Sequence, residues 1–153
     1  MIKLNLPVYN FRIREQNSKQ QIFDTNRKKF VALTPEEWVR QNFTRYLVEE
    51  KQYPVSLISI EKGLLVERRN KRTDIVIYNR SGNPLVIVEC KAPEVKITPD
   101  VFDQIVRYNI SLNANYLVVT NGIEHFCCQL SYADNSYSSN LLFFNGRLDW
   151  SAF

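Results

Sequence analysis

The chain is poor in the features that would mark a membrane protein, a secreted protein or a nucleotide-driven motor. Its apolar runs, such as residues 85–88, are only a few residues long, far below the roughly 20 that span a bilayer. The N-terminus lacks the basic region and long apolar stretch of a signal peptide, so we expect a cytoplasmic protein without membrane contact. There are four glycines and no G-x-x-x-x-G-K-[ST] motif, which excludes a P-loop motor within these 153 residues.

Residues that bind soft metals or form disulfides are also scarce. The three cysteines, Cys90, Cys127 and Cys128, are odd in number and show neither C-x-x-C nor zinc-site spacing. We expect all three to be small buried side chains on strands. The single histidine, His125, begins an expected strand, and we interpret it as structural. A Ser-His-Asp hydrolase is not supported, because G-x-S-x-G is absent.

Apolar residues make up 44% and charged residues 24% of the chain, which is typical of a globular domain. The net charge of +4 is unevenly distributed. Residues 12–29 contain six basic and two acidic side chains, and residues 62–72 contain five basic and one acidic. Two basic clusters could follow a phosphate backbone, or they could be a solvated hairpin tip and an N-terminal arm. The charge alone does not separate these interpretations.

The pattern along the chain predicts an α/β protein. Thr34-Pro35-Glu36-Glu37 combines a capping residue, a proline at the first helical position and a capping-box glutamate. It therefore predicts a helix that ends before Pro54. The full set of expected elements is a basic arm or hairpin over 1–33, helices over 34–51 and 98–113, strands over 55–60, 64–67, 73–78, 85–91, 116–120 and 125–130, turns over 68–72 and 79–84, and a C-terminal hairpin between 141–144 and 147–150.

The connections predict a mixed sheet with helices on its faces. Short turns join the first strands, so these strands should be antiparallel. The second helix is a crossover long enough to place strand 116–120 parallel to an earlier strand. We expect residues 34–153 to form one domain, with 1–33 as an added arm.

Three charged residues lie where two of these strands should meet. Glu89 and Lys91 are two residues apart on one strand, so their side chains leave the same face, and the carbonyl of Cys90 lies between them. Asp74 begins the preceding strand, and an antiparallel hairpin brings that point beside the end of its partner. The pattern predicts that Asp74 and Glu89 converge at one end of the pair.

Two carboxylates and a carbonyl oxygen are hard ligands that suit Mg²⁺ or Mn²⁺. A neighbouring lysine can position or deprotonate an attacking water, or neutralise charge that develops on a phosphate. The combination of Asp74, Glu89, the Cys90 carbonyl and Lys91 is therefore suited to metal-assisted hydrolysis of a phosphodiester.

Asp74 followed by Glu89-Cys90-Lys91 at the end of a buried strand resembles the PD-(D/E)xK nuclease superfamily, and in particular the N-terminal nuclease domain of type I restriction enzyme R subunits. Gln104 and Tyr108 on the following helix are similar to the Q-x-x-x-Y motif of RecB-like nucleases. The resemblance implies a restriction-endonuclease-like αβββαβ core. It also implies metal binding by Asp74, Glu89 and the Cys90 carbonyl, catalysis by Lys91, and contact of Gln104 and Tyr108 with substrate phosphates or the site.

Several features of the resemblance stay open. Thr73 replaces the proline of the family motif. A further acid could come from Glu37, Glu50 or Glu61, with Gln41 as another polar candidate, although Glu37 is best explained by the capping box.

The expected partner is DNA, held near the site by Arg68, Arg69, Lys71 and Arg72. The expected function is a Mg²⁺-dependent DNA endonuclease, and the alternative is a catalytically silent nucleic-acid-binding or assembly module on the same fold. RNA is not excluded as a substrate. A homodimer or separate motor and specificity subunits are further expectations.

Overall fold

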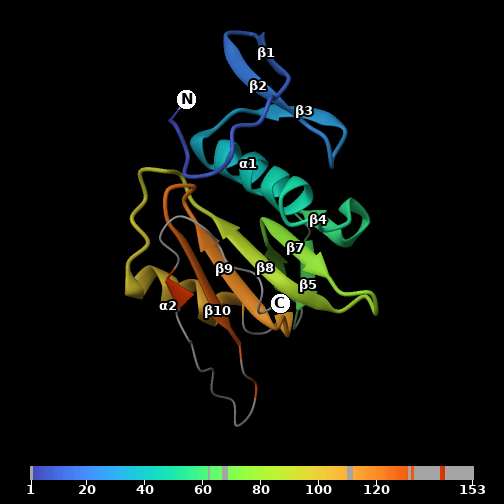
Figure 1. Ribbon diagram of the computed structural model, residues 1–153, viewed down its shortest axis with the longest axis vertical. Coiled ribbons are helices and arrows are strands. Elements are labelled where there is room, and N and C mark those ends of the chain that lie inside the picture. The colour runs from blue at the N-terminus through green and yellow to red at the C-terminus, as the bar shows by residue number, and fades with distance from the viewer. Residues whose placement is uncertain are drawn as a thin grey trace.

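The computed structural model describes residues 2–61, 63–66, 69–109, 112–130, 132 and 142–143. Within this part of the chain it has two α-helices and a mixed six-stranded sheet (Figure 1). The elements are β1 (Ile13–Gln16), β2 (Lys19–Asp24), β3 (Lys29–Ala32), α1 (Pro35–Glu49), the 3₁₀ turn η1 (Val55–Leu57), β4 (Ile58–Ile60), β5 (Gly63–Val66), β6 (Arg69–Arg72), β7 (Ile75–Tyr78), β8 (Pro84–Cys90), α2 (Pro99–Asn109), β9 (Tyr116–Thr120), β10 (His125–Gln129) and β11 (Leu142–Phe143).

The start of α1 follows from local chemistry. Thr34 has extended backbone angles, and its Oγ1 accepts a hydrogen bond from the Glu37 backbone N–H at 3.1 Å. Pro35 occupies the first turn, where a missing N–H costs nothing. The Thr34 cap that the sequence predicts is confirmed, and it fixes where the acidic first turn of α1 lies. The predicted capping-box role of Glu37 is wrong, because the Thr34 N–H donates to the Ala32 carbonyl at 3.1 Å and the Glu37 carboxylate accepts from arginine and glutamine side chains instead.

The main sheet has the strand order β11-β10-β9-β8-β7-β4. β8 and β9 are parallel, and the other neighbouring strands are antiparallel. The crossover between the parallel strands contains α2, as the sequence predicts. β8 is therefore a central strand with partners on both sides, which accounts for its continuous apolar run.

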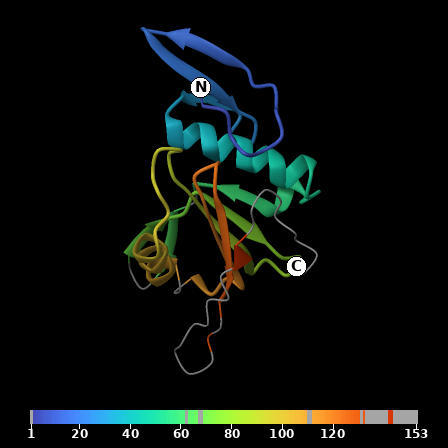
Figure 2. The ribbon, with the colours of Figure 1, turned by 60° about the vertical axis from the view of Figure 1, so that its left-hand side comes forward.

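The two helices pack on opposite faces of this sheet (Figures 1 and 2). Val39, Phe43 and Leu47 of α1 pack with Val86 and Val88 of β8. On the other face, the apolar side of α2 packs with Ile87 of β8 and with alternate residues of β9 and β10, namely Leu117, Val119 and Cys128. Strand alternation thus places Val86 and Val88 against α1 and Ile87 against α2.

The N-terminal region forms a three-stranded antiparallel sheet, β1-β2-β3. This sheet lies over α1, on the side of the helix away from the main sheet (Figure 2). Ile22 of β2 is fully buried, so this sheet is anchored to the rest of the chain.

The predicted basic turn over 68–72 is wrong in part, because residues 69–72 are a strand. Arg69, Lys71 and Arg72 belong to β6, which pairs antiparallel with β5, and Val66 is opposite Arg69. Residues 67 and 68 connect the two strands and lie outside the described residues. The physical reason is that pairing with β5 satisfies the backbone polar groups of the basic segment, a gain that charge patterning does not reveal.

Other predicted boundaries shift slightly. The first three residues of the expected strand 55–60 form the 3₁₀ turn η1, and the strand β4 begins at Ile58. Helix α2 ends at Asn109 rather than near 113. Of the expected C-terminal hairpin, only β11 is described; the remainder lies outside the described residues. Among the residues that the structure covers, no helix is both long enough and apolar enough to cross a bilayer.

Candidate metal-dependent active site

Asp74 and Glu89 meet at one end of the β7–β8 pair. The last registered pair is Ile75 with Val88, so Asp74 and Glu89 are the next residues across from each other. The Cys90 backbone N–H donates to Asp74 Oδ2 at 2.7 Å. Glu89 alternates with Val88 and Cys90, so its side chain is on the face of the sheet that α2 covers. The convergence that the sequence predicts is present.

Both carboxyl groups resist ionisation. Burial, and to a lesser extent the negative charge of Asp74, raise the pKa of Glu89 to about 8. Burial also raises the pKa of Asp74, although the hydrogen bond from Cys90 opposes this effect. Glu36, an exposed residue in the first turn of α1, raises the pKa of both groups. Acidic groups are therefore concentrated at this end of the sheet, where burial and mutual repulsion favour their neutral forms.

Lys91 supplies positive charge to the same place. Its backbone N–H donates to the Thr120 carbonyl at 2.8 Å, which extends the parallel pairing past the end of β8. Its ammonium charge lowers the pKa of Asp74 and of Glu89, against the larger effect of burial. Lys91 thus acts electrostatically on both carboxylates, as its spacing from Glu89 predicts.

Glu89 has one oxygen without a hydrogen-bond partner. Its Oε1 is buried and unpaired, which is costly for a polar atom. Hydrogen bonding by the side chain of Asn109 lowers the pKa of Glu89, less than burial raises it. Asn109 is fully buried at the end of α2, and its Nδ2 also donates to the Ile105 carbonyl at 2.9 Å. We did not identify Asn109 from the sequence, although its place on the apolar stripe of α2 is a signal for a buried polar role.

The donor set fits a hard divalent cation. It combines two carboxylates that repel one another with an unpaired buried oxygen, and a cation would relieve both costs. In the described part of the chain, no three histidine, cysteine, aspartate or glutamate side chains are grouped as a metal site. The predicted set has two side chains and the Cys90 carbonyl, and its metal-binding role stays a prediction.

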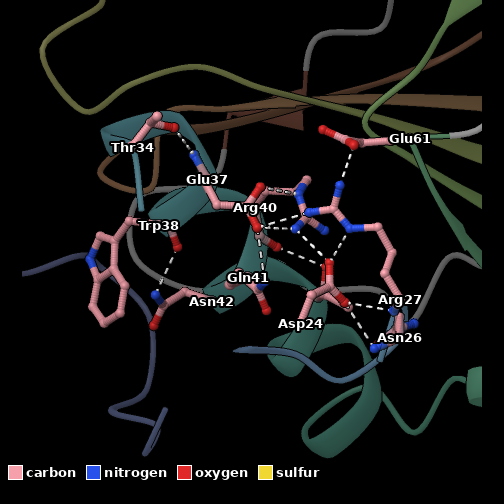
Figure 3. A network of polar contacts seen from close by, with 11 residues as sticks. Asp24, Asn26, Arg27, Thr34, Glu37, Trp38, Arg40, Gln41, Asn42 and Glu61 are labelled. Atoms are coloured by element: carbon pink, nitrogen blue, oxygen red, sulfur yellow. Dashed lines mark hydrogen bonds and ion pairs between the residues drawn. The ribbon is translucent and has the colours of Figure 1, made fainter. Parts of the chain in front are cut away.

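A buried ionic network lies between the N-terminal sheet and α1 (Figure 3). Arg27, from the turn between β2 and β3, donates to Asp24 Oδ2 at 2.6 Å and Glu37 Oε1 at 3.1 Å, and pairs with Glu61. Arg40 donates to Asp24 Oδ2 at 2.8 Å and pairs with Glu37. Burial alone would raise the pKa of Asp24, but the hydrogen bond from Arg27 and the charges of both arginines lower it.

This network interacts with the candidate site in two ways, by a hydrogen bond and by an electrostatic effect. The Glu61 backbone N–H donates to the Asp74 carbonyl at 2.9 Å, and the charge of Arg40 lowers the pKa of Asp74. The N-terminal sheet is thereby connected to the strand that carries the first carboxylate. Sequence reasoning missed this connection, because Arg27 is 34 residues from Glu61.

The candidates for a further acid are placed differently. Glu37 is bonded to Arg27, Arg40 and Gln41, with Gln41 Nε2 at 2.8 Å. Glu61 is paired with Arg27. Glu50 is at the far end of α1, where its charge contributes to raising the pKa of Tyr9. The negative charge of Glu36 raises the pKa of both Asp74 and Glu89. We did not single out Glu36 from the sequence.

The structure says less about the remaining predicted site residues. Gln104 is exposed on α2, while the side chain of Tyr108 and the whole of Arg68 lie outside the described residues. For Arg69, Lys71 and Arg72 the structure gives only the strand β6. Their roles in catalysis and DNA binding stay predictions.

The three cysteines are buried, as expected, and His125 is buried too. Cys90, Cys127 and Cys128 are buried free thiols. Burial lowers the pKa of His125, whose Nδ1 is 2.7 Å from Thr120 Oγ1 and whose Nε2 is 3.3 Å from the Asn5 carbonyl.

One comparison with known proteins identifies a family for this chain. A search of curated proteins finds no match. The family model for the type I restriction enzyme R protein N terminus (HSDR_N) matches residues 35–140, which include every element from α1 to β10. The matched segment contains Asp74, Glu89, Lys91 and α2, and the chain belongs to the type I restriction enzyme R protein N-terminal family.

Proposed function

We propose that this chain is a metal-dependent deoxyribonuclease of the PD-(D/E)xK type. Membership of the family indicates a nuclease-like function that involves DNA. The observation that carries the finer proposal is the pair Asp74 and Glu89, held at one end of two buried strands with Glu89 Oε1 unpaired. A surface ion pair would need no such buried site, because exposed pairs contribute only about 0–1 kcal/mol.

The order of elements supports a restriction-endonuclease-like core. α1 precedes β4, β7 and β8, and α2 then connects β8 to the parallel strand β9. The β5–β6 hairpin is inserted between β4 and β7. This arrangement is compatible with the αβββαβ order of the superfamily, and it puts Asp74 and Glu89 on neighbouring strands.

Asp74, Glu89 and the Cys90 carbonyl would hold Mg²⁺ or Mn²⁺. When bound, the cation would polarise a phosphodiester and stabilise negative charge on its oxygens. Its binding would also require Glu89 to be ionised, which the charge of Lys91 favours.

The chain's own side chains then act on water and phosphate. The Lys91 ammonium would orient the attacking water or neutralise the charge that develops on the phosphate. Gln104 and Tyr108 would contact neighbouring phosphates or support the site, and Asn109 would orient the Glu89 carboxylate. Arg68, Arg69, Lys71 and Arg72 would contact the DNA backbone.

Nicking of supercoiled DNA tests the proposal. We expect Mg²⁺- or Mn²⁺-dependent nicking that stops in EDTA and falls by at least about 100-fold in Asp74→Asn and in Lys91→Ala, as for groups that act on the transition state. The matched controls Asp100→Asn and Lys96→Ala change exposed residues beyond β8 and should retain activity. Nicking that survives Asp74→Asn, or DNA binding without product at any concentration of either metal, would overturn the proposal. Cleavage of RNA but not DNA would overturn the assigned substrate.

A further inference from the structure

The outer face of the N-terminal sheet carries positive charge and no carboxylate among its described residues. The register places Arg14 opposite Gln21, Gln16 opposite Lys19, and Phe23 opposite Phe30. The Phe23 N–H donates to the Arg12 carbonyl at 2.9 Å, which continues the pairing by one residue. Alternation then puts one set of side chains on a common face, here named the outer face. It consists of Arg12, Arg14, Gln16, Lys19, Gln21, Phe23, Phe30 and Ala32.

The acids of the same segment are on the opposite face. Glu15 and Asp24 share the side of Ile22, which is fully buried. Asp24 is itself 2% exposed and neutralised by Arg27 and Arg40. Three of the six cations of residues 12–29, namely Arg12, Arg14 and Lys19, are therefore displayed on the outer face with no acid of the sheet beside them.

The two arginines of the outer face are held in place by aromatic rings. The Arg14 guanidinium lies 3.9 Å from the centre of the Phe30 ring, and its Nε donates to Gln21 Oε1 at 2.8 Å. The Arg12 guanidinium lies 4.7 Å from the centre of the Phe23 ring. The rings themselves are half-buried, while both arginines are exposed. Guanidiniums fixed in this way lose less freedom when they bind an anion.

We propose that the outer face binds the phosphate backbone of DNA. Exposed and preorganised guanidiniums suit phosphate oxygens, and Lys19 adds a third cation at the end of the β1–β2 hairpin. Because guanidiniums cover both rings, the phenylalanines are not free to stack on bases. Binding is therefore independent of sequence and depends strongly on salt.

The outer face belongs to a part of the chain that the family match does not cover, since the match begins at residue 35. The sheet is nonetheless close to the site end of the molecule. Gln20 of β2 lines one pocket together with Pro93 and Glu94, which follow Lys91, and with Thr34 and Trp38. Gln20 is on the face opposite the outer face, so this pocket places the sheet, and not the outer face itself, near the residues that follow Lys91. The inference deepens the proposed nuclease function, but DNA binding can be tested without catalysis.

The experiment measures binding of a fluorescent DNA duplex to the full chain in EDTA between about 50 mM and about 200 mM salt. One variant combines Arg12→Gln, Arg14→Gln and Lys19→Gln. The matched control combines Lys3→Gln, Lys51→Gln and Arg80→Gln, which removes the same charge elsewhere. Thermal unfolding of both variants checks folding, and binding to anionic lipid vesicles is measured in parallel.

We expect the outer-face variant to bind DNA about 10- to 100-fold more weakly, with a salt slope smaller by about 2 to 3, while the control stays within about threefold of wild type. Equal weakening of both variants would show that only net charge matters and would overturn the inference. It would also be overturned if wild type does not bind DNA, or if the outer-face variant loses binding to vesicles but not to DNA. If wild type binds DNA through this face but never nicks it, the inference stands and the proposed function fails.

Discussion

Replacement of Glu89 by glutamine should stabilise the metal-free protein at alkaline pH. The folded-state pKa of Glu89 is raised to about 8 from an ordinary 4.5, chiefly by burial. A group whose pKa is raised by folding contributes stability at low pH and loses it as pH rises through the folded value. Glutamine mimics the neutral acid at every pH, so Glu89→Gln should escape this loss.

The size of the effect follows from the shift. The folded and unfolded pKa values of Glu89 differ by about 3.5. At 1.36 kcal/mol for each pH unit, this difference limits the gain in the free energy of unfolding to about 5 kcal/mol. The free energy of unfolding of Glu89→Gln should begin to exceed that of wild type above about pH 4.5. The difference should widen up to about pH 8 and then stay constant. Bound Mg²⁺ should narrow the gap, because it stabilises only the folded wild type.

Urea unfolding in EDTA at several pH values between about 5 and 9 measures this difference. Comparison of the two proteins at each pH removes the contribution of other titrating groups. The exposed control Glu94→Gln should follow wild type throughout. A gap between Glu89→Gln and wild type that does not change with pH would refute the raised pKa and the buried carboxylate pair behind it.

Three further predictions concern stability and are measured by chemical denaturation. Thr34→Ala should lower the free energy of unfolding by about 1 kcal/mol through loss of the helix cap; an unchanged midpoint would contradict the cap. Gly122→Ala should cost about 1–2 kcal/mol or more, because Gly122 has φ +82° and the new Cβ would lie 2.7 Å from Leu4 Cδ2. Arg40→Ala should cost about 3 kcal/mol, because it removes the more buried of the two arginines that neutralise Asp24 and Glu37 and leaves only Arg27, against less than about 1 kcal/mol for the control Arg45→Ala.

Local chemistry made several parts of the fold predictable. The Thr34 cap and Pro35 determine where α1 begins, and the continuous apolar run of β8 indicates a central strand. The spacing of Glu89 and Lys91, with Asp74 at the start of a hairpin partner, predicts which side chains gather at one sheet end. Each of these inferences uses only neighbours in sequence or a single short turn.

Features that depend on distant contacts were not predictable. Arg27 contacts Glu37 and Glu61 only because the N-terminal sheet folds over α1. The charge of Glu36 reaches the site because the start of α1 lies near the end of β8, a packing relation that no local pattern encodes. The basic segment 69–72 was expected as a turn because charge is typical of turns, but pairing with β5 makes it a strand.

The most direct measurement is a crystal of the full chain soaked in Mn²⁺, with anomalous scattering used to locate the metal. We predict a single strong peak between the carboxylates of Asp74 and Glu89 within bonding distance of the Cys90 carbonyl oxygen, at about 2.0–2.2 Å from each oxygen ligand, as for small divalent cations. The peak should be absent from crystals of Asp74→Asn. An empty site in wild type at saturating Mn²⁺, or a peak that persists in Asp74→Asn, would contradict the metal centre on which the proposed nuclease depends.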